Sequence, residues 1–334
     1  MQRINNLYHQ IADYDNLLLA FWKASKGKRR KADVRGFQSN LHVEIQKLRA
    51  GLLNETIEVG DYHYFKVYDP KERTICAASF PERVLHHAII NICEPYFESF
   101  QIHDSYACRK EKGSLKAVKR AKEFSTKNDA YLKLDIAKYF DSIDHEVLIS
   151  LLHRRFRDKR LLWLFEKIIA SYETSPGKGV PIGNLTSQHF ANFYLGVLDH
   201  HLKDDLGIKG YVRYMDDFII FHPDKRRLRE LLEEIDSFLA GKLKLRLNPK
   251  IYLNYTHQGI NFLGYRVFDN TILLGQRSRN RFVSRLRKYE KRFVNGFWSE
   301  NELVAHIQPL MAFTMNANAL SFRQSILQRF GAVS

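Results

Sequence analysis

Cysteine is scarce in this chain, and the three cysteines that are present lie far apart. Cys76, Cys93 and Cys108 are odd in number and lack the spacing of metal ligands. They therefore indicate neither a disulfide framework nor a zinc site. The 14 histidines form no Cys/His cluster and no His-Glu-x-x-His pattern, so we assign them no chemistry.

Long apolar runs are missing as well. The chain contains no stretch of about 18 apolar residues, the length that a membrane-spanning helix needs. It has no lipidation signal, and it begins with polar residues rather than with a signal peptide. No internal repeat or low-complexity segment is present. We therefore expect a cytoplasmic protein that does not contact a membrane.

Acidic residues are few relative to basic ones. The chain has 37 Asp and Glu against 53 Lys and Arg, which gives a formal net charge of +16. Such a surplus indicates a polyanionic partner, and nucleic acid is the leading candidate because each neutralised phosphate releases condensed counterions. The content of 45% hydrophobic and 13% aromatic residues over 334 positions predicts a folded chain rather than a disordered one.

Two adjacent aspartates, Asp216 and Asp217, lie between apolar runs at 210–213 and 218–221. The flanking residues are β-branched or aromatic, so the pattern predicts a hairpin that carries both carboxylates at its turn. Two like charges held close together repel unless a cation neutralises them, and oxygen-only ligands favour Mg²⁺. The alternative is an ordinary hairpin turn, in which aspartate is common.

A third carboxylate, Asp135, ends a segment in which apolar and polar residues alternate. This alternation predicts a half-buried strand whose end opens on a site. Three carboxylates from two strands can bridge two Mg²⁺ ions, with Mn²⁺ as a substitute. Such a metal pair clamps the attacking and leaving oxygens of an in-line displacement. The expected reaction is therefore phosphoryl or nucleotidyl transfer.

The remaining sequence pattern predicts a mixed α/β fold. Expected helices cover residues 2–21, 33–52, 81–100, 114–125, 144–173 with a break near 157–158, 185–205 and 224–240. Expected strands cover a hairpin at 62–68 and 73–79, the strand that ends at Asp135, the hairpin at 210–221, and the pieces 251–254 and 261–267.

Two basic segments are candidates for contact with a nucleic-acid backbone. The first contains Lys28, Arg29 and Arg30, and its alternative is a solvated loop with surplus charge. The second is a predicted amphipathic helix whose cations would face a duplex while its apolar stripe docks on the protein. A surface helix with incidental charge is its alternative. The candidate cations of this helix are Arg277, Arg281, Arg285, Lys288 and Arg292.

Five motifs occur in an order that resembles a reverse transcriptase of the superfamily that includes group II intron and retron enzymes. They are Asp135 with 140–143, then 181–188, 214–217, 247–250 and 262–265. The resemblance implies a right-hand polymerase fold with fingers, an RRM-like palm and a helical thumb. The implied regions are an N-terminal helical extension at 1–61, fingers at 62–130, a palm at 131–267 with a fingers-like insertion at about 145–180, and a thumb at 268–334.

The resemblance also implies roles for single residues. The metal ligands are Asp135, Asp216 and Asp217, with the carbonyl of Ile136 as a further ligand. The nucleotide pocket contains Phe140 beneath the sugar, where it excludes a 2′-hydroxyl, Ser187 and Gln188 at the start of a helix, and Lys250 near the leaving pyrophosphate. The primer grip is Phe262, Leu263, Gly264 and Tyr265. The alternatives are a core phenylalanine, a solvated lysine and a plain strand with a glycine bulge.

The resemblance also marks three arginines of the fingers as nucleotide-binding residues, the first two where relatives place triphosphate-binding cations and the third in a fingers block of the family pattern. They are Arg73, Arg83 and Arg109. Arginine suits phosphate recognition because its planar guanidinium donates several hydrogen bonds. The alternative is that each arginine holds the fingers together through a structural hydrogen bond.

The block that begins at Ile182 most resembles reverse transcriptases of diversity-generating retroelements, because most other relatives carry glutamine there. Isoleucine makes no polar contact near the templating pair, so we hypothesise reduced fidelity. The subfamily implies that a template RNA is copied into cDNA with errors at adenines, for mutagenic retrohoming in a bacterial, phage or archaeal host. It implies a primer strand, deoxynucleoside triphosphates and a small accessory RNA-binding protein in trans. The alternatives are a reverse transcriptase of an antiphage-defence or retron-like system and a noncatalytic RNA-binding protein.

Overall fold

The computed structural model describes residues 4–68 and 72–330, and these fall into two compact units. Each unit is assembled from three stretches of chain. The first contains Met1–His103, Ile136–Gly207 and Ile235–Pro249, and the second contains Asp104–Asp135, Ile208–Glu234 and Lys250–Ser334. Helices and strands are mixed, as the sequence predicts. Within the described ranges, no helix is long and apolar enough to cross a membrane.

The first unit is mainly helical, and its core surrounds α5 (Phe80–Glu98), which packs against α2 (Tyr14–Ser25) and α10 (Leu185–His200). Phe97 of α5 contacts four other phenylalanine rings, those of Phe156, Phe165, Phe190 and Phe193. Aromatic side chains bury large apolar areas, so this cluster is a major part of the packing. The other helices of the unit are α1 (Tyr8–Ile11), α3 (Ala32–Ser39), α4 (Leu41–Leu53), α7 (Tyr139–Ser142), α8 (His145–Arg155) and α9 (Lys159–Ala170).

A two-stranded hairpin, β1 (Tyr62–Val67) and β2 (Arg73–Ala78), belongs to the same unit. The strands are antiparallel, with Tyr62 opposite Ala78, which confirms the predicted hairpin. Most of β1 is exposed, whereas Cys76 and Ala78 of β2 are buried. The strand β2 is therefore the one that packs against the rest of the unit.

The predicted break near 157–158 is confirmed, because it separates α8 from α9. Each helix begins at an aspartate whose carboxylate accepts a hydrogen bond from a backbone N–H of the first turn. Asp144 accepts from Val147 and Asp158 accepts from Leu161. Such caps satisfy donors that an α-helix leaves without partners at its start.

Three predicted helices have different limits in the structure. The helix expected at 2–21 is instead two helices, because Asp13 caps the start of α2 by accepting from the N–H groups of Asp15 and Asn16. The helix expected at 33–52 is divided into α3 and α4 at Asn40, whose φ of −120° is not helical. The helix expected at 185–205 is α-helical only to His200 and continues as a π-helical turn, η1 (His201–Asp205).

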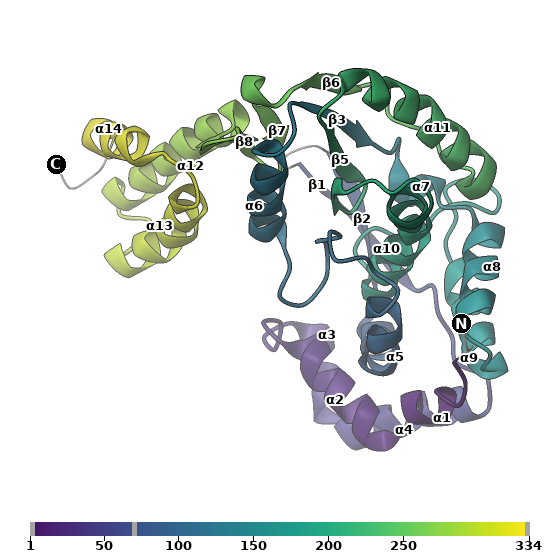
Figure 1. The fold of residues 1–334 in the computed structure, drawn as a ribbon. Coiled ribbons are helices and arrows are strands. Elements are labelled where there is room, and N and C mark those ends of the chain that lie inside the picture. The colour runs from purple at the N-terminus through teal and green to yellow at the C-terminus, as the bar shows by residue number, and fades with distance from the viewer. Residues whose placement is uncertain (1–3, 69–71, 331–334) are drawn as a thin grey trace. The chain divides into compact units, whose positions relative to one another are not determined.

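The second unit is built on a four-stranded antiparallel sheet with the order β4-β5-β3-β6, of which β3, β5 and β6 are labelled in Figure 1. Its strands are β3 (Ala130–Asp135), β4 (Gly210–Tyr214), β5 (Asp217–His222) and β6 (Tyr252–Tyr255). The helix α6 (Ser114–Ser125), which has the predicted limits, packs against this sheet. Its buried residues Ala117, Val118, Ala121 and Phe124 form one core with Val212, Ile219 and Phe221 of the sheet. The helix α6 therefore covers one face of the sheet.

A second sheet and three helices complete this unit. The strands are β7 (Ile260–Phe262), β8 (Tyr265–Val267) and β9 (Ile272–Leu274), and the helices are α12 (Gln276–Val294), α13 (Glu300–Met315) and α14 (Leu320–Phe330). The strand predicted at 261–267 is thus two short strands joined by a turn. Both α13 and α14 pack against α12 (Figure 1). The remaining long helix, α11 (Lys225–Leu243), begins in the second unit and ends in the first.

Candidate active site

The paired aspartates lie on the tight turn between β4 and β5, as predicted. Tyr214 pairs with Asp217 across the hairpin, so Met215 and Asp216 form the turn itself. Two-residue hairpin turns need positive φ values, which are costly for residues other than glycine. Met215 adopts such a conformation, with φ +58°. The turn is therefore strained, and surrounding contacts must hold it in place.

Arg213 provides one of those contacts. It is fully buried, and its Nη1 donates a 3.0 Å hydrogen bond to the carbonyl of Met215. Its backbone is fixed as well, because its N–H donates to Asp104 and its carbonyl accepts from Tyr106. An arginine buried to this extent is expensive unless it is well paired. We infer that Arg213 positions the turn that carries Asp216.

Asp135 lies directly opposite Asp217 in the pairing of β3 with β5. Residues that face each other across antiparallel strands have Cβ atoms about 5 Å apart and side chains on the same face of the sheet. The structure thus brings the third predicted carboxylate to the hairpin. Because like charges directly opposite each other destabilise a sheet, this arrangement has no benefit for folding.

Lys133 also belongs to this site, although the sequence reasoning missed it. Its ammonium lies 2.8 Å from Oδ1 of Asp217, and the side chains of Lys133 and Asp217 are 17% and 25% exposed. The alternation along β3 was the available signal, since it places Lys133 on the same face as Asp135, two residues away. The pairing register of β3 with β5, which brings Asp217 beside Lys133, could not be read from the sequence.

The pKa of Asp217 is raised from 3.8 to about 6. Burial away from water is the main cause, and the charge of Asp135 adds to it, while the positive charge of Lys133 acts in the opposite direction. An ionised carboxylate at this position is therefore costly. A divalent cation would remove that cost by supplying positive charge at the carboxylates.

The donor set fits a divalent metal only in part. Over residues 4–68 and 72–330, no group of three or more His, Cys, Asp or Glu side chains is arranged so that it could hold an ion by itself. The Oδ1 atom of Asp217 is nevertheless buried 2.8 Å from the ammonium of Lys133, so this carboxylate already faces a cation. Mg²⁺ usually takes one or two carboxylates and completes its shell with water and substrate phosphates. Asp135 and Asp217, with Asp216 beside them, suit that mode of binding.

Ile136, whose carbonyl was predicted as a further ligand, is buried just after β3 and forms an isolated bridge with Leu247. Lys250, predicted near the pyrophosphate, is exposed and precedes β6. The structure therefore places Ile136 next to Asp135 in the chain, while Lys250 lies on the surface of the second unit. The role of Ile136 as a metal ligand and that of Lys250 toward a nucleotide stay predictions.

Several predicted nucleotide residues gather in the first unit, around β2. Cys76 of β2 donates a 2.8 Å hydrogen bond from its N–H to the carbonyl of Ile182. Gly183 has φ +122°, and a Cβ there would lie 2.9 Å from the side chain of Ile75, so only glycine fits. The loop at 181–184 is thus held against the hairpin that carries Arg73.

The other predicted pocket residues of the first unit lie on α10 and α7. Ser187 is buried and Gln188 is half-buried in the first turn of α10. Phe140 is half-buried in α7, and its carbonyl accepts a hydrogen bond from Val180. Phe140 is therefore not a fully buried core residue, although its ring contacts that of Tyr139.

Two of the predicted fingers arginines make structural contacts. Arg83 forms an ion pair with Asp33 and lies over the ring of Phe80. Arg109 donates a 2.6 Å hydrogen bond to the carbonyl of Ser105. Arg73 is exposed at the start of β2. These contacts support the structural alternative for Arg83 and Arg109, and a role toward the triphosphate stays a prediction.

The predicted primer grip is the turn between β7 and β8. Phe262 pairs with Tyr265, and the two residues between them, Leu263 and Gly264, have φ values of +50° and +88°. The carbonyl of Gly264 accepts a 2.7 Å hydrogen bond from the hydroxyl of Ser278 in α12. The turn is therefore anchored on the helices that follow it.

The two predicted basic surfaces are both present. In α12 the five predicted cations are exposed, while Phe282 and Leu286 are buried, so one face is apolar and the other is cationic.

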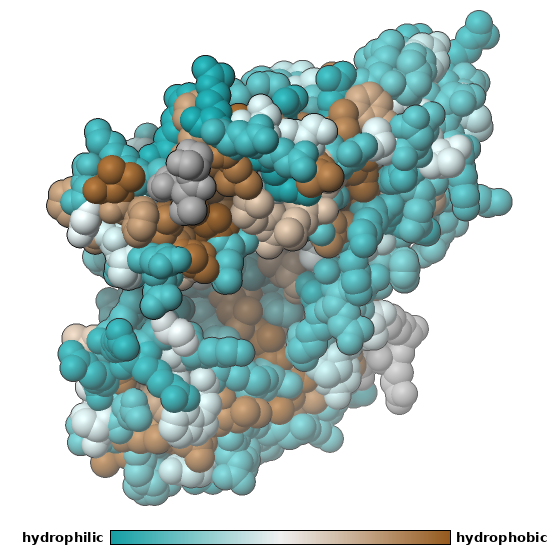
Figure 2. Space-filling view, turned by 90° about the vertical axis from the view of Figure 1, so that its left-hand side faces the viewer, coloured by the Kyte–Doolittle hydropathy of each residue, from teal (hydrophilic) through white to brown (hydrophobic). Residues whose placement is uncertain are grey.

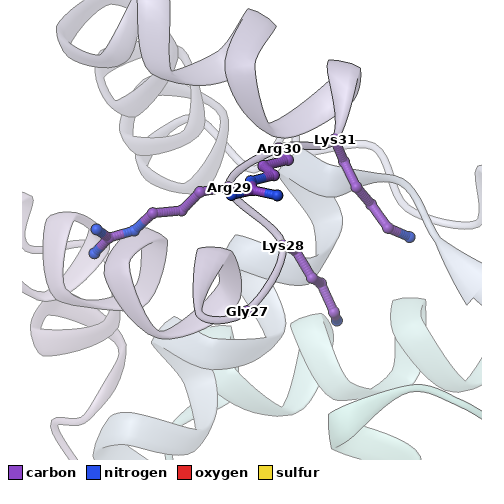
Figure 3. A pocket seen from close by; sticks show the side chains of 5 residues that line it. All are labelled: Gly27, Lys28, Arg29, Arg30 and Lys31. Carbon is purple, nitrogen blue, oxygen red and sulfur yellow. The ribbon is translucent and has the colours of Figure 1, made fainter. Parts of the chain in front are cut away.

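The loop Gly27–Lys31 lines a cavity of about 540 Å³, in which Lys28 and Lys31 point away from Arg29 (Figure 3). Burial and the neighbouring cations lower the pKa of Lys28. Hydrophilic residues also cover most of the molecular face shown in Figure 2.

Comparison with known proteins identifies the family. A family model described as reverse transcriptase (RNA-dependent DNA polymerase) matches residues 68–267, which include all the motifs above. The chain belongs to the reverse transcriptase family. The predicted enzyme class and superfamily are thereby confirmed.

Individual relatives are similar to this reverse transcriptase at low identity. Protein YkfC of Escherichia coli (strain K12) is 27% identical over 290 residues, which are 72% of this chain and 75% of that protein. Group II intron-encoded protein LtrA of Lactococcus lactis subsp. cremoris is 24% identical over 295 residues, which are 68% of this chain and 48% of LtrA. The putative COX1/OXI3 intron 2 protein of Saccharomyces cerevisiae is 22% identical and covers 77% of this chain and 38% of that protein. The chain thus spans half or less of these intron proteins.

The fold is also similar to a solved structure. Apo telomerase from Candida tropicalis, truncated from its C-terminal domain, aligns with a TM-score of 0.50 at 12% identity. The alignment covers 65% of this chain and 55% of the telomerase chain. This likeness concerns the fold, and it confirms the predicted right-hand polymerase architecture.

Asp217→Asn is expected to stabilise the metal-free protein above about pH 6. Because the pKa of Asp217 is raised to about 6, the folded state keeps a proton that the unfolded chain has already lost. The stability of the wild type therefore falls as pH rises from about 4 to 6, by up to about 3 kcal/mol, and asparagine escapes this loss. Urea unfolding in chelator across this pH range measures the effect, with the exposed Asp129→Asn as control. Parallel curves for wild type and Asp217→Asn would contradict the prediction.

Proposed function

We propose that this chain extends a DNA strand on an RNA template, with Asp135, Asp216 and Asp217 as the ligands of two Mg²⁺ ions that Mn²⁺ can replace. The observation that carries the proposal is the register that sets Asp135 opposite Asp217 beside a strained two-residue turn. When bound, the metal ions would supply the positive charge that in-line nucleotidyl transfer needs. The carbonyl of Ile136 is a further proposed ligand.

The residues of the chain itself would hold the substrates. The exposed cationic face of α12 and the basic loop at Lys28 suit the phosphates of the template RNA and of the primer or cDNA strand. Phe140 would lie against the sugar and select deoxynucleoside triphosphates. The other proposed nucleotide contacts are Lys250, Arg73, Ser187 and Gln188. Residues 262–265 form the proposed primer grip.

We also propose which residues form each region of the polymerase fold. Residues 1–61 are the N-terminal extension, residues 62–130 are the fingers, and residues 268–334 are the thumb. The palm, at 131–267 with an insertion at about 145–180, contains the four-stranded sheet with all three aspartates. This assignment is supported by the helices α12 to α14, which follow the last strand, and of which α13 and α14 pack against α12.

The biological role that we propose is mutagenic copying for a diversity-generating retroelement, in the cytoplasm of a bacterial, phage or archaeal host. Ile182 supports it: its carbonyl is held by Cys76, and its side chain is apolar and half-buried. An apolar side chain near the templating pair adds no hydrogen bond that a mismatch would lose, so errors cost less. A small accessory RNA-binding protein would act in trans.

Asp216→Ala is expected to reduce primer extension on an RNA template by at least about a hundredfold, because it removes a carboxylate from the metal site. Extension by purified protein with Mg²⁺ and deoxynucleoside triphosphates measures this loss. Asp236→Ala, which removes an exposed carboxylate from α11, is the matched control and should match wild type. Equal extension by wild type and Asp216→Ala would refute the catalytic assignment.

Ile182→Gln is expected to lower misincorporation opposite template adenines by about fivefold, the effect of one hydrogen bond of about 1 kcal/mol. Sequencing of the cDNA measures the error rate, and Ile182→Leu, which keeps an apolar side chain, serves as control. An unchanged adenine error rate in Ile182→Gln would remove the link between this residue and low fidelity, while leaving the polymerase assignment intact.

A further inference from the structure

Lys133 is a cation placed inside the carboxylate site by the fold of the central sheet. It lies opposite Ile219 in β5 and opposite Tyr252 in β6, so strands on both sides fix its backbone. Its side chain is 17% exposed and reaches diagonally across the sheet, with the ammonium 2.8 Å from Oδ1 of Asp217. Lys133 is therefore not an ordinary surface lysine, because its side chain is half-buried and its ammonium contacts a predicted metal ligand.

The ion pair of Lys133 with Asp217 joins one ammonium to one carboxylate. Oδ1 of Asp217 is buried, and the ammonium of Lys133 lies 2.8 Å from it. Lys244, in the first unit, shows the other type of ion pair, because its ammonium donates hydrogen bonds to the carboxylates of Asp144 and Glu146. Lys244 is therefore fixed between two anions, whereas the ion pair of Lys133 is with Asp217.

A charge contact of this kind is easy to exchange. The lysine side chain has four flexible carbons, and its ammonium is a point charge with no fixed orientation. A divalent cation at Asp217 would carry twice the charge and would repel the ammonium from the same oxygen. The carboxylate can therefore have Lys133 or a metal ion at Oδ1, but not both at close range.

We propose that Lys133 is the resident counter-cation of the metal site, which neutralises Asp217 until a divalent ion displaces it. This inference rests on the proposed metal-binding role of the aspartates. Its consequence is that the nucleotide-free protein binds the metal weakly, because the ion must first displace the ammonium. A nucleotide brings its own negative phosphates to the site, which offset the charge of Lys133, so metal and nucleotide binding are coupled. Lys133 is thus a positioning residue that sets when the metal enters.

The test is the binding of Mn²⁺ to the nucleotide-free protein, followed by electron paramagnetic resonance. Lys133→Met keeps the length of the side chain and removes its charge, so Mn²⁺ should bind about tenfold more tightly than to wild type. Lys133→Arg keeps the charge and should bind like wild type. Lys119→Met, on the exposed face of α6, is the matched control and should also bind like wild type.

The outcomes separate this inference from the metal site itself. If wild type and Asp216→Asn bind Mn²⁺ equally, the proposed metal site is wrong, and the role of Lys133 is wrong with it. If Asp216→Asn loses binding but Lys133→Met binds no more tightly than wild type, only the role of Lys133 is overturned. Weaker binding by Lys133→Met overturns it as well, because the lysine would then support the metal rather than compete with it.

A measurement on the wild type keeps the inference testable if Lys133→Met does not fold. An amine-reactive reagent modifies lysines according to how free their amino groups are, and mass spectrometry gives the extent at each position. Saturating Mn²⁺ should increase the labelling of Lys133 severalfold, because the ion frees the ammonium from Asp217, and should leave Lys119 unchanged. Labelling of Lys133 that does not respond to Mn²⁺ overturns the inference.

Discussion

The repulsion between carboxylates that the sheet holds together is the constraint on which the rest of the site depends. The pairing of β3 with β5 sets Asp135 opposite Asp217, and burial raises the pKa of Asp217 to about 6. Folding gains nothing from this arrangement, since like charges across a strand pair destabilise it. We propose that its use is the capture of a cation, and membership of the reverse transcriptase family supports this proposal.

The surrounding structure holds these charges in place. The core between α6 and the sheet fixes the strands, and Arg213 binds the carbonyl of Met215, where the backbone is strained. Lys133 offsets part of the negative charge of Asp217. Each of these features would be unnecessary for an ordinary hairpin turn. Together they support the view that the stability of the sheet compensates for an unfavourable site, as is usual for catalytic centres.

Sequence patterns predicted the elements that local chemistry determines. The helix at 114–125, the hairpin at 62–79 and the break near 157–158 were predicted correctly, because hydrophobic periodicity and capping residues specify them. The three aspartates were found from their residue types and their strand context. The single helix expected at 2–21 was wrong because Asp13, a capping residue inside an apolar pattern, was not recognised as a helix start.

Contacts between distant segments could not be predicted in the same way. Lys133 and Asp217 meet only because β3 and β5 pair in one particular register, and no local pattern encodes that register. The burial of Arg213 depends on the segment at 104–106, which is more than 100 residues earlier in the chain. The ion pair of Arg83 with Asp33 likewise joins elements whose contact the sequence did not reveal.

The central claim is that Asp135, Asp216 and Asp217 form one metal site, and cleavage by bound Fe²⁺ tests it most directly. Iron that replaces Mg²⁺ generates hydroxyl radicals with ascorbate and peroxide, and these cut the polypeptide close to the ion. The account predicts cuts near Asp135 and near the Asp216–Asp217 turn in the same molecule, both suppressed by excess Mg²⁺. Cuts at only one of these segments, or cuts elsewhere that Mg²⁺ does not suppress, would contradict it.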